Sequence, residues 1–213
     1  MEIRVNPTRM ELNRLKKRLS MAQRGHKLLK DKRDELIRQF LILVRKNKDL
    51  REYVEQELAA AFAKFLLARA VMPHEALEEA LMYPTRRAAL TVQKQNIMSV
   101  YAPRISWEEA ETETGESSIF PYGFVDTSAE LDVSIETLSG IMPRLLELAQ
   151  VEKAVQLLAD EIEKTRRRVN ALEYVLIPKI EGTIRYITMK LDESERSALT
   201  RLMKIKDVVR SKT

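Results

Sequence analysis

The 213-residue chain contains no cysteine, so it can form neither a disulfide nor a thiolate-bound metal site. Its only two histidines, His26 and His74, lie far apart in the sequence and cannot by themselves build a metal cluster. Five glycines leave no glycine-rich loop of the kind that holds phosphates, which argues against nucleotide binding by this chain alone. A Ser/His/Asp or Cys/His catalytic set cannot be assembled either. The sequence therefore predicts no active site and no cofactor.

Aromatic residues make up only 6% of the chain, with Trp107 as the single tryptophan, which is too few for a base-stacking platform. No stretch approaches the roughly 20 consecutive apolar residues that span a bilayer. The first seven residues lack the apolar core of a signal peptide. We expect a protein that is cytoplasmic, or peripheral to a membrane.

Charged residues are abundant, at 32% of the chain, with 37 Lys and Arg against 32 Asp and Glu and a net charge of +5. Acids and bases are interleaved along most of the sequence, a pattern typical of long helices with solvated faces. So mild an excess of positive charge favours solubility over dense phosphate binding.

The first long pattern is a heptad repeat that begins at Thr8 and Glu11, which match a helix-capping box. Apolar residues recur at alternating spacings of three and four along this segment and, after a four-residue stutter, continue to Met72. Pro73 then ends the run. The pattern predicts a helix over residues 8–72, about 95 Å long at the usual rise per residue.

A second stripe starts at another capping-box match, Thr127–Glu130, and closes through Ile205, which is expected to lie near the start of the first helix. Pro143 and Pro178 sit inside it and are expected to bend the helix. Two such stripes predict a mainly α fold in which two long helices form an antiparallel coiled coil, with both termini at one end. Three regions are expected: an N-terminal helix (1–72), a connecting segment (73–126) and a C-terminal helix (127–213).

The connecting segment differs in character, because Ala89–Gln93 and Asn96–Val100 are β-prone and Ile105 and Trp107 alternate with polar residues. We expect a small β-hairpin or short sheet with a polar loop. Three flanking pieces are expected to form a short helix, an acidic loop and an apolar turn, respectively: His74–Tyr83, Glu108–Glu116 and Ile119–Phe124.

Polar residues interrupt the apolar stripe of the first helix at three places. Asn47 is most simply a device that fixes the pairing register. His26 and Arg33 indicate either a loosely packed, partly wet stretch or a segment that another protein sheaths. The same level of the second helix is rich in arginine, so the two stretches predict one basic belt: Arg24, Lys27, Lys30, Arg33, Arg166, Arg167 and Arg168.

Several long motifs resemble the family of D subunits found in V-type and archaeal A-type ATPases. They include Asn6–Leu12, Arg24–Leu36 and Lys164–Tyr174, and further matches stand at Asn96–Val100, Ala129–Asp132, Ile177–Pro178, Glu195–Arg196, Arg201–Leu202 and Lys204–Lys206. The resemblance covers essentially the whole chain, and its motifs are long and occur in order.

The resemblance implies the role of a central rotor shaft without catalytic activity of its own. Its paired termini would enter a hexamer of A and B subunits, where the basic belt would make contact. Its other end would meet the funnel-shaped C (or d) subunit, which caps a membrane ring moving H⁺ or Na⁺. The F subunit would clip to its side. The hairpin, with Ile97, Met98 and Val100, would stimulate ATP hydrolysis.

Two hypotheses from other classes compete with this one. A coiled-coil adaptor or tether with no motor partner would bind its partners without nucleotide dependence. A nucleic-acid-binding arm, suggested by the isoelectric point near 9.3, would show steep salt dependence. Neither accounts for the long motifs, so we expect no nucleic-acid partner.

Overall fold

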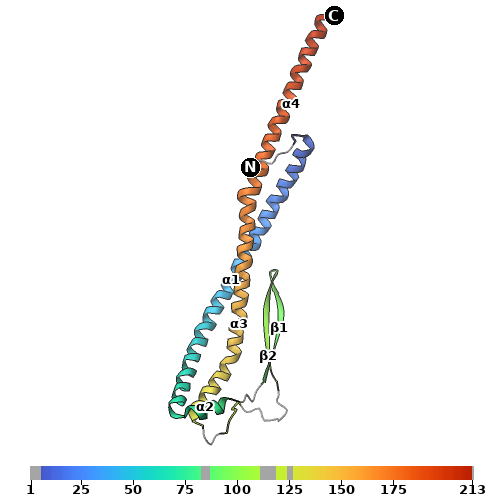
Figure 1. Ribbon diagram of the computed structural model, residues 1–213. Coiled ribbons are helices and arrows are strands. Elements are labelled where there is room, and N and C mark those ends of the chain that lie inside the picture. The colour runs from blue at the N-terminus through green and yellow to red at the C-terminus, as the bar shows by residue number, and fades with distance from the viewer. Residues whose placement is uncertain (1–5, 83–86, 111–118, 124–126, 213) are drawn as a thin grey trace. The chain divides into compact units, whose positions relative to one another are not determined.

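The computed structural model describes residues 6–82, 87–110, 119–123 and 127–212. The predicted fold class is confirmed, because long N- and C-terminal helices flank a small β-hairpin. None of the described helices is apolar over a length that could cross a bilayer. The elements in chain order (Figure 1) are α1 (Arg9–Val71), α2 (His74–Leu81), β1 (Arg87–Ile97), β2 (Val100–Ala110), α3 (Ala129–Asn170), the π-helical segment η1 (Ala171–Leu176) and α4 (Ile177–Lys212).

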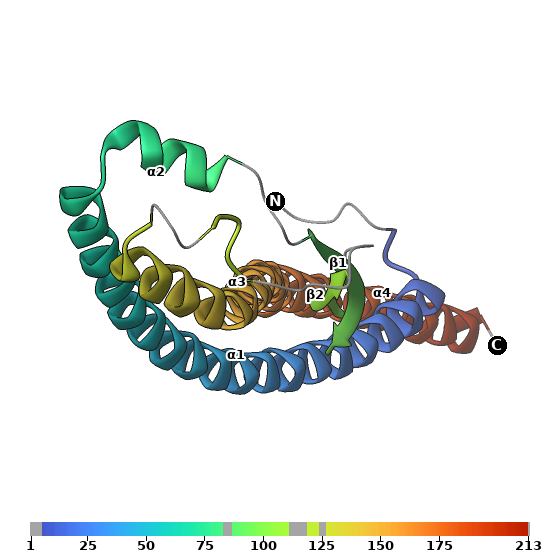
Figure 2. The same ribbon diagram turned by 90° about the horizontal axis from the view of Figure 1, so that it is seen from below.

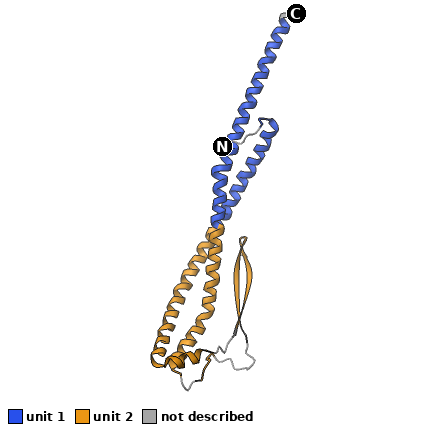
Figure 3. Ribbon diagram, viewed as in Figure 1, with its two compact units in different colours: residues 1–35, 162–213 blue, residues 36–161 orange. Residues whose placement is uncertain are grey.

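The chain divides into two compact units (Figure 3), of which unit 1 contains residues 1–35 and 162–213. Its core joins Leu15 of α1 to Ile180 and Ile187 of α4, all almost fully buried. Arg9 pairs with Glu195, whereas His26, further along α1, contacts Glu173, which comes earlier in the sequence. The two helices of unit 1 therefore run antiparallel.

Unit 2 contains residues 36–161 and pairs the rest of α1 with α3. Val54, Ala61 and Ile141 form one buried cluster between these helices. The Ser134 hydroxyl, itself fully buried, donates a hydrogen bond of 3.2 Å to the Ala61 carbonyl oxygen. This bond satisfies a polar group that would otherwise destabilise an apolar seam.

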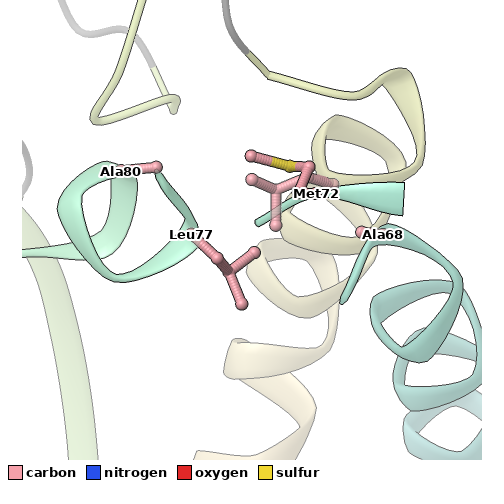
Figure 4. Close-up of a cluster of buried hydrophobic side chains, with 5 residues drawn as sticks. Ala68, Met72, Leu77 and Ala80 are labelled. Carbon is pink, nitrogen blue, oxygen red and sulfur yellow. The ribbon is translucent and has the colours of Figure 1, made fainter. Parts of the chain in front are cut away.

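The short helix α2 closes the end of unit 2. Leu77 and Ala80 of α2 join Ala68, Met72 and Leu131 in a second buried cluster. In Figure 4 the Leu77 side chain projects from α2 toward the side where Met72 and Ala68 lie. The helix predicted for this segment is confirmed up to Leu81, and Tyr83, where it was expected to end, lies outside the described residues.

One of the two predicted caps forms. The Glu11 backbone N–H donates to Thr8 Oγ1 at 3.3 Å, directly before α1 begins. The cap predicted from Thr127 is wrong, because its hydroxyl donates to the Gly123 carbonyl oxygen at 3.3 Å instead and α3 begins only at Ala129. The Gly123 carbonyl oxygen is a partner for Thr127 that the sequence pattern did not show.

The two prolines have different effects. Helix α3 continues through Pro143. Pro178 is the second residue of α4, which follows η1 directly. At the end of η1 the Ile177 N–H bonds to the Leu172 carbonyl oxygen five residues back. In an α-helix, Pro178 would crowd the carbonyl four residues earlier and could not donate to it. The distortion expected at Pro178 is thus a wider, π-helical turn.

The hairpin turns at Met98 and Ser99, whose φ angles are 51° and 72°. Positive φ at both central residues is the requirement of a two-residue type I′ turn. The Ser99 N–H donates to Asn96 Oδ1 at 2.9 Å, which helps to hold this turn. The β-prone stretch Asn96–Val100 therefore contains the end of β1, the turn and the start of β2.

The two strands twist about each other (Figure 2), as two-stranded ribbons generally do. Strand β2 runs through Ala110, so the first residues of the predicted acidic loop, Glu108–Glu116, belong to a strand. The rest of that loop, residues 111–116, lies outside the described residues. Phe124, the last residue of the predicted apolar turn, lies outside them too. The hairpin lies beside α3, and the Ile105 N–H donates to Gln150 Oε1 at 3.0 Å.

Candidate partner-binding surfaces

The two compact units carry opposite charge. Unit 1 has 24 Lys and Arg against 12 Asp and Glu, a net of +12, and unit 2 has 13 against 20, a net of −7. The mild total of +5 hides this division, because antiparallel pairing gathers both basic chain ends into one unit. Unit 1 therefore suits acidic partner surfaces and unit 2 suits basic ones.

The structure brings the residues of the predicted basic belt into one unit, with all seven in unit 1. The contact between His26 and Glu173, 3.3 Å between Nε2 and Oε2, sets the alignment of the helices. Counting from this contact puts Arg33 close to the level of Arg166. Six of the seven side chains are exposed, and Arg33 is half-buried.

Three members of the belt have partners on their own helix, and the first, Arg24, donates through Nε to the Ser20 carbonyl oxygen at 3.4 Å. Arg33 pairs with Asp34, with 2.7 Å between Nη2 and Oδ1, and Arg167 pairs with Glu163. Arg166 and Arg168 point into solvent on either side of buried Thr165 and Val169. The arrangement leaves a broad positive surface around the seam between the two helices.

The polar residues that interrupt the seam behave differently from one another. His26 reaches across to Glu173, as described above. Asn47, in unit 2, has a buried Oδ1 with no hydrogen-bond partner in the described part of the chain. Its interpretation as a register device stays a prediction.

The C-terminal part of α4 carries a surface that the sequence pattern did not reveal. Because Arg9, the first residue of α1, pairs with Glu195, the following turns of α4 extend past the described start of α1. The expected proximity of Ile205 to the start of α1 is therefore wrong. Six large apolar side chains of this stretch are more than half exposed: Leu199, Leu202, Met203, Ile205, Val208 and Val209.

Basic residues surround these apolar ones. Five Lys or Arg residues lie between 196 and 210, against a single acidic residue, Asp207. An exposed apolar stretch rimmed by charge marks a surface that a partner covers. The only signal in the sequence was the continuation of the heptad stripe, which could equally have meant pairing with α1.

A second exposed apolar surface lies on α1 in unit 2, near α2. Phe62, Leu66, Leu67 and Val71 are each more than half exposed, and Met82 after α2 is 69% exposed. The surrounding segment is rich in alanine and leucine, and it has more apolar residues than a single helix–helix seam can bury. A heptad count assigns one face to the coiled coil and overlooks the other.

No group of three or more His, Asp and Glu among the described residues is placed to hold a metal ion. A cleft of about 310 Å³ opens between α1 and α4 and is lined by Arg9, Leu12, Asn13, Thr188, Leu191, Asp192 and Glu195. Its mixed lining, with an ion pair across it, suits a protein contact better than a substrate.

Fold and surfaces together define a coiled-coil component of a larger assembly, with apolar and charged faces left for partners. The family model described as the D subunit of ATP synthase matches residues 11–207, and the chain belongs to this family. It is accordingly a component of a V/A-type ATPase complex.

Curated relatives match along nearly their whole length. The V-type ATP synthase D subunit of Clostridium botulinum (strain Langeland) is 61% identical over 212 residues, which cover 100% of this chain and 98% of that protein. The D subunit of Acetivibrio thermocellus is 63% identical over 207 residues, covering 97% and 92%. That of Thermoanaerobacter sp. (strain X514) is 58% identical, covering 97% of each chain.

Proposed function

We propose that this chain is the central-stalk rotor shaft of its ATPase. It transmits torque between ATP hydrolysis or synthesis in a hexamer of A and B subunits and H⁺ or Na⁺ movement through a membrane ring. The observation that carries the proposal is the C-terminal part of α4, which exposes apolar and basic side chains beyond the described start of α1. Such a helix end requires an enclosing partner.

The charge and the exposed apolar residues of each unit suit a different partner. Unit 1, positive and ending in this apolar stretch, is the part that the A and B subunits surround, with the basic belt against their inner wall. Unit 2, negative and with Phe62 and Leu66 exposed near α2, meets the C (or d) subunit that caps the ring. The F subunit holds the side of the helical pair, and the chain associates with the membrane on its cytoplasmic side through these partners.

Rotation sets a limit on how tightly the shaft is held. Nucleotide-driven changes in the hexamer turn the asymmetric helical pair, which resists twisting because its seam is packed and its backbone hydrogen-bonded. A single deep binding well would stall it, since each 1.4 kcal/mol slows escape about tenfold. Exposed arginines with long, flexible side chains supply weak contacts that can be exchanged as the shaft turns.

Single-molecule rotation tests the proposal. The complex is fixed to glass through its A or B subunits, and a gold particle is attached to this chain through a cysteine that replaces Lys48, whose side chain is 74% exposed. The label goes to this position alone, because the chain has no cysteine of its own. ATP should drive one-way rotation of the particle, whereas a complex with inactive catalytic sites should show only random motion. A particle that stays still while ATP is hydrolysed would instead identify the chain as a static tether.

Removal of the exposed end of α4 gives a second measurement. A chain ending at Ser197 keeps the Arg9–Glu195 pair and the buried core of unit 1. It should assemble but deliver less torque than the full chain.

Removal of β1 and β2 should leave the helical pair folded and change the stimulation of ATP hydrolysis, which tests the regulatory role of Ile97, Met98 and Val100.

A further inference from the structure

The outer edge of β1 is the remaining feature that neither the fold nor the proposed rotation explains. β1 and β2 form a sheet of two strands, and no third strand stands beside β1 in the described part of the chain. Every residue of β1 from Ala88 to Asn96 is exposed. An edge of this length is a template for pairing with another strand, which proteins normally cover or block.

The register shows which backbone groups point outward. Residues of an antiparallel pair alternate between those bonded to the facing strand and those whose N–H and C=O face away. The Ile105 N–H donates to Gln150 of α3, so it points away from β1, and its cross-strand partner Val92 must point away from β2 in the same manner. Every second residue of β1 shares this orientation: Ala88, Leu90, Val92, Lys94 and Asn96.

Two further observations agree with this assignment. Pro103, which has no N–H, lies opposite Lys94, at a position whose N–H would face outward. Ile97 and Val100, which flank the two-residue turn, have the bonded parity that closes such a turn. The ladder between the strands therefore uses the odd-numbered residues of β1 and leaves the even-numbered ones unused.

The two edges of the hairpin are treated differently. The outer edge of β2 is interrupted by Pro103, which has no N–H to offer, and the outward N–H of Ile105 is already bonded to Gln150 of α3. The outer edge of β1 has no proline, and its side chains Leu90 and Val92 are 55% and 63% exposed. Protection of one edge and exposure of the other marks β1 as an acceptor.

We propose that β1 accepts an extended segment of another component of the ATPase, which adds to the hairpin as a third strand. The partner segment carries apolar residues beside Leu90 and Val92 and an acidic residue beside Lys94. This chemistry follows from charge, because Arg87 and Lys94 are the only charged residues of β1 and both are positive. Backbone groups hold the segment, and alternate side chains select it.

Strand pairing constrains where the partner comes from. A row of backbone hydrogen bonds cannot be broken and remade at each turn, so the segment belongs to a protein that turns with this chain if the chain is a rotor. The assignment of the segment to a co-rotating protein rests on the proposed function, but the strand pairing itself does not. A static complex would show the same protection of β1, so the two ideas fail separately.

Hydrogen exchange with residue-level resolution tests the pairing, comparing the purified chain with the complete ATPase. The amides of Leu90, Val92 and Lys94 should exchange at least tenfold more slowly in the complex, whereas that of Gln93, bonded to β2 in both, should change little. Unchanged exchange at the outward amides would overturn the proposal. So would equal protection that appears in the isolated chain as its concentration rises, because that outcome assigns the edge to a second copy.

Proline substitutions separate the edge from the hairpin itself. Val92→Pro removes an outward N–H and should leave the hairpin intact, as Pro103 does in β2, but should abolish the added protection of Leu90 and Lys94 in the complex. Thr91→Pro removes an inward N–H and should open the hairpin in the isolated chain. Val92→Ala keeps the N–H and controls for the lost side chain. Full protection of Leu90 and Lys94 in the Val92→Pro complex would contradict strand addition.

Discussion

Lys46 of α1 and Glu147 of α3 lie with Nζ and Oε1 only 2.6 Å apart and so join the two helices of unit 2. The hydrogen bond from Lys46 lowers the pKa of Glu147 below its ordinary value, and Arg144, 3.1 Å away, acts in the same direction. Because the pKa is lower in the folded chain than in the unfolded one, the pair stabilises the fold above the ordinary pKa of a glutamate. That stabilisation disappears as the pH falls through the lowered pKa.

Glu147→Gln should therefore lower the free energy of unfolding at pH 7 by about 0.5–1 kcal/mol, the range of partly exposed ion pairs. The difference from the parent chain should vanish at a pH below the lowered pKa. Urea unfolding at several pH values measures both. Arg144→Gln, which keeps the Lys46 bond, should cost less. A difference that does not change with pH would show that the charge of Glu147 is not its cause.

Leu131→Ala should destabilise unit 2 strongly. Leu131 is fully buried at the start of α3, against Ala68, Met72 and Leu77, where truncation leaves a cavity. We expect a loss of about 2–5 kcal/mol by urea unfolding, as for other buried leucines. Val133→Ala, two residues further on and 41% exposed, is the control and should cost far less. Equal losses would mean that this cluster contributes no more than the surface does.

Replacement of Arg166, Arg167 and Arg168 by glutamine should lower ion movement per ATP hydrolysed in the reconstituted complex. The change removes three positive charges from the belt that we place against the hexamer. Glutamine at Lys16, Lys17 and Arg18, which are also exposed and in unit 1, removes the same charge elsewhere and should have the smaller effect. Torque and ATPase rate that remain unchanged in the first variant would exclude the belt as a contact.

Met98→Asn combined with Ser99→Gly should stabilise the hairpin. Both residues have positive φ, which costs about 1–2 kcal/mol for an ordinary L-residue, whereas Asn-Gly is the preferred pair for this turn. Slower exchange of the Gln93 and Gln95 amides would report the gain. If ATP hydrolysis is stimulated less by the variant, then the Met98 side chain or the strain at the tip contributes to stimulation. Faster exchange would contradict the type I′ assignment.

The sequence predicts the helical pair well because a seam is a local, repeating signal. Leu15, Val54 and Leu131 occupy apolar positions of the two heptad stripes, and all three are buried. The hairpin was predicted from β-prone residues, but not its turn, since Met98-Ser99 lacks the glycine or asparagine that normally marks one. Asn96 supplies its side chain from outside the turn, which no count of turn residues detects.

The partner surfaces were harder to predict. The spacing of apolar residues through Leu202 and Ile205 is the same whether or not a second helix faces this part of α4. Only the Arg9–Glu195 pair shows which residue of α4 lies opposite the start of α1. The opposite charges of the two units were hidden for a similar reason. They emerge only when the antiparallel pairing assigns residues from both chain ends to one unit.

The division into units also has a consequence for the order of folding. Unit 2 is one continuous stretch of chain, whereas unit 1 consists of two pieces separated by the 126 residues of unit 2. During synthesis the N-terminal turns of α1 must wait without their partner until Ile180 and Ile187 have left the ribosome. Prior folding of unit 2 shortens the loop that must close and so reduces its entropic cost. We expect the chain to close from its middle outward, with the two ends that carry the positive charge joining last.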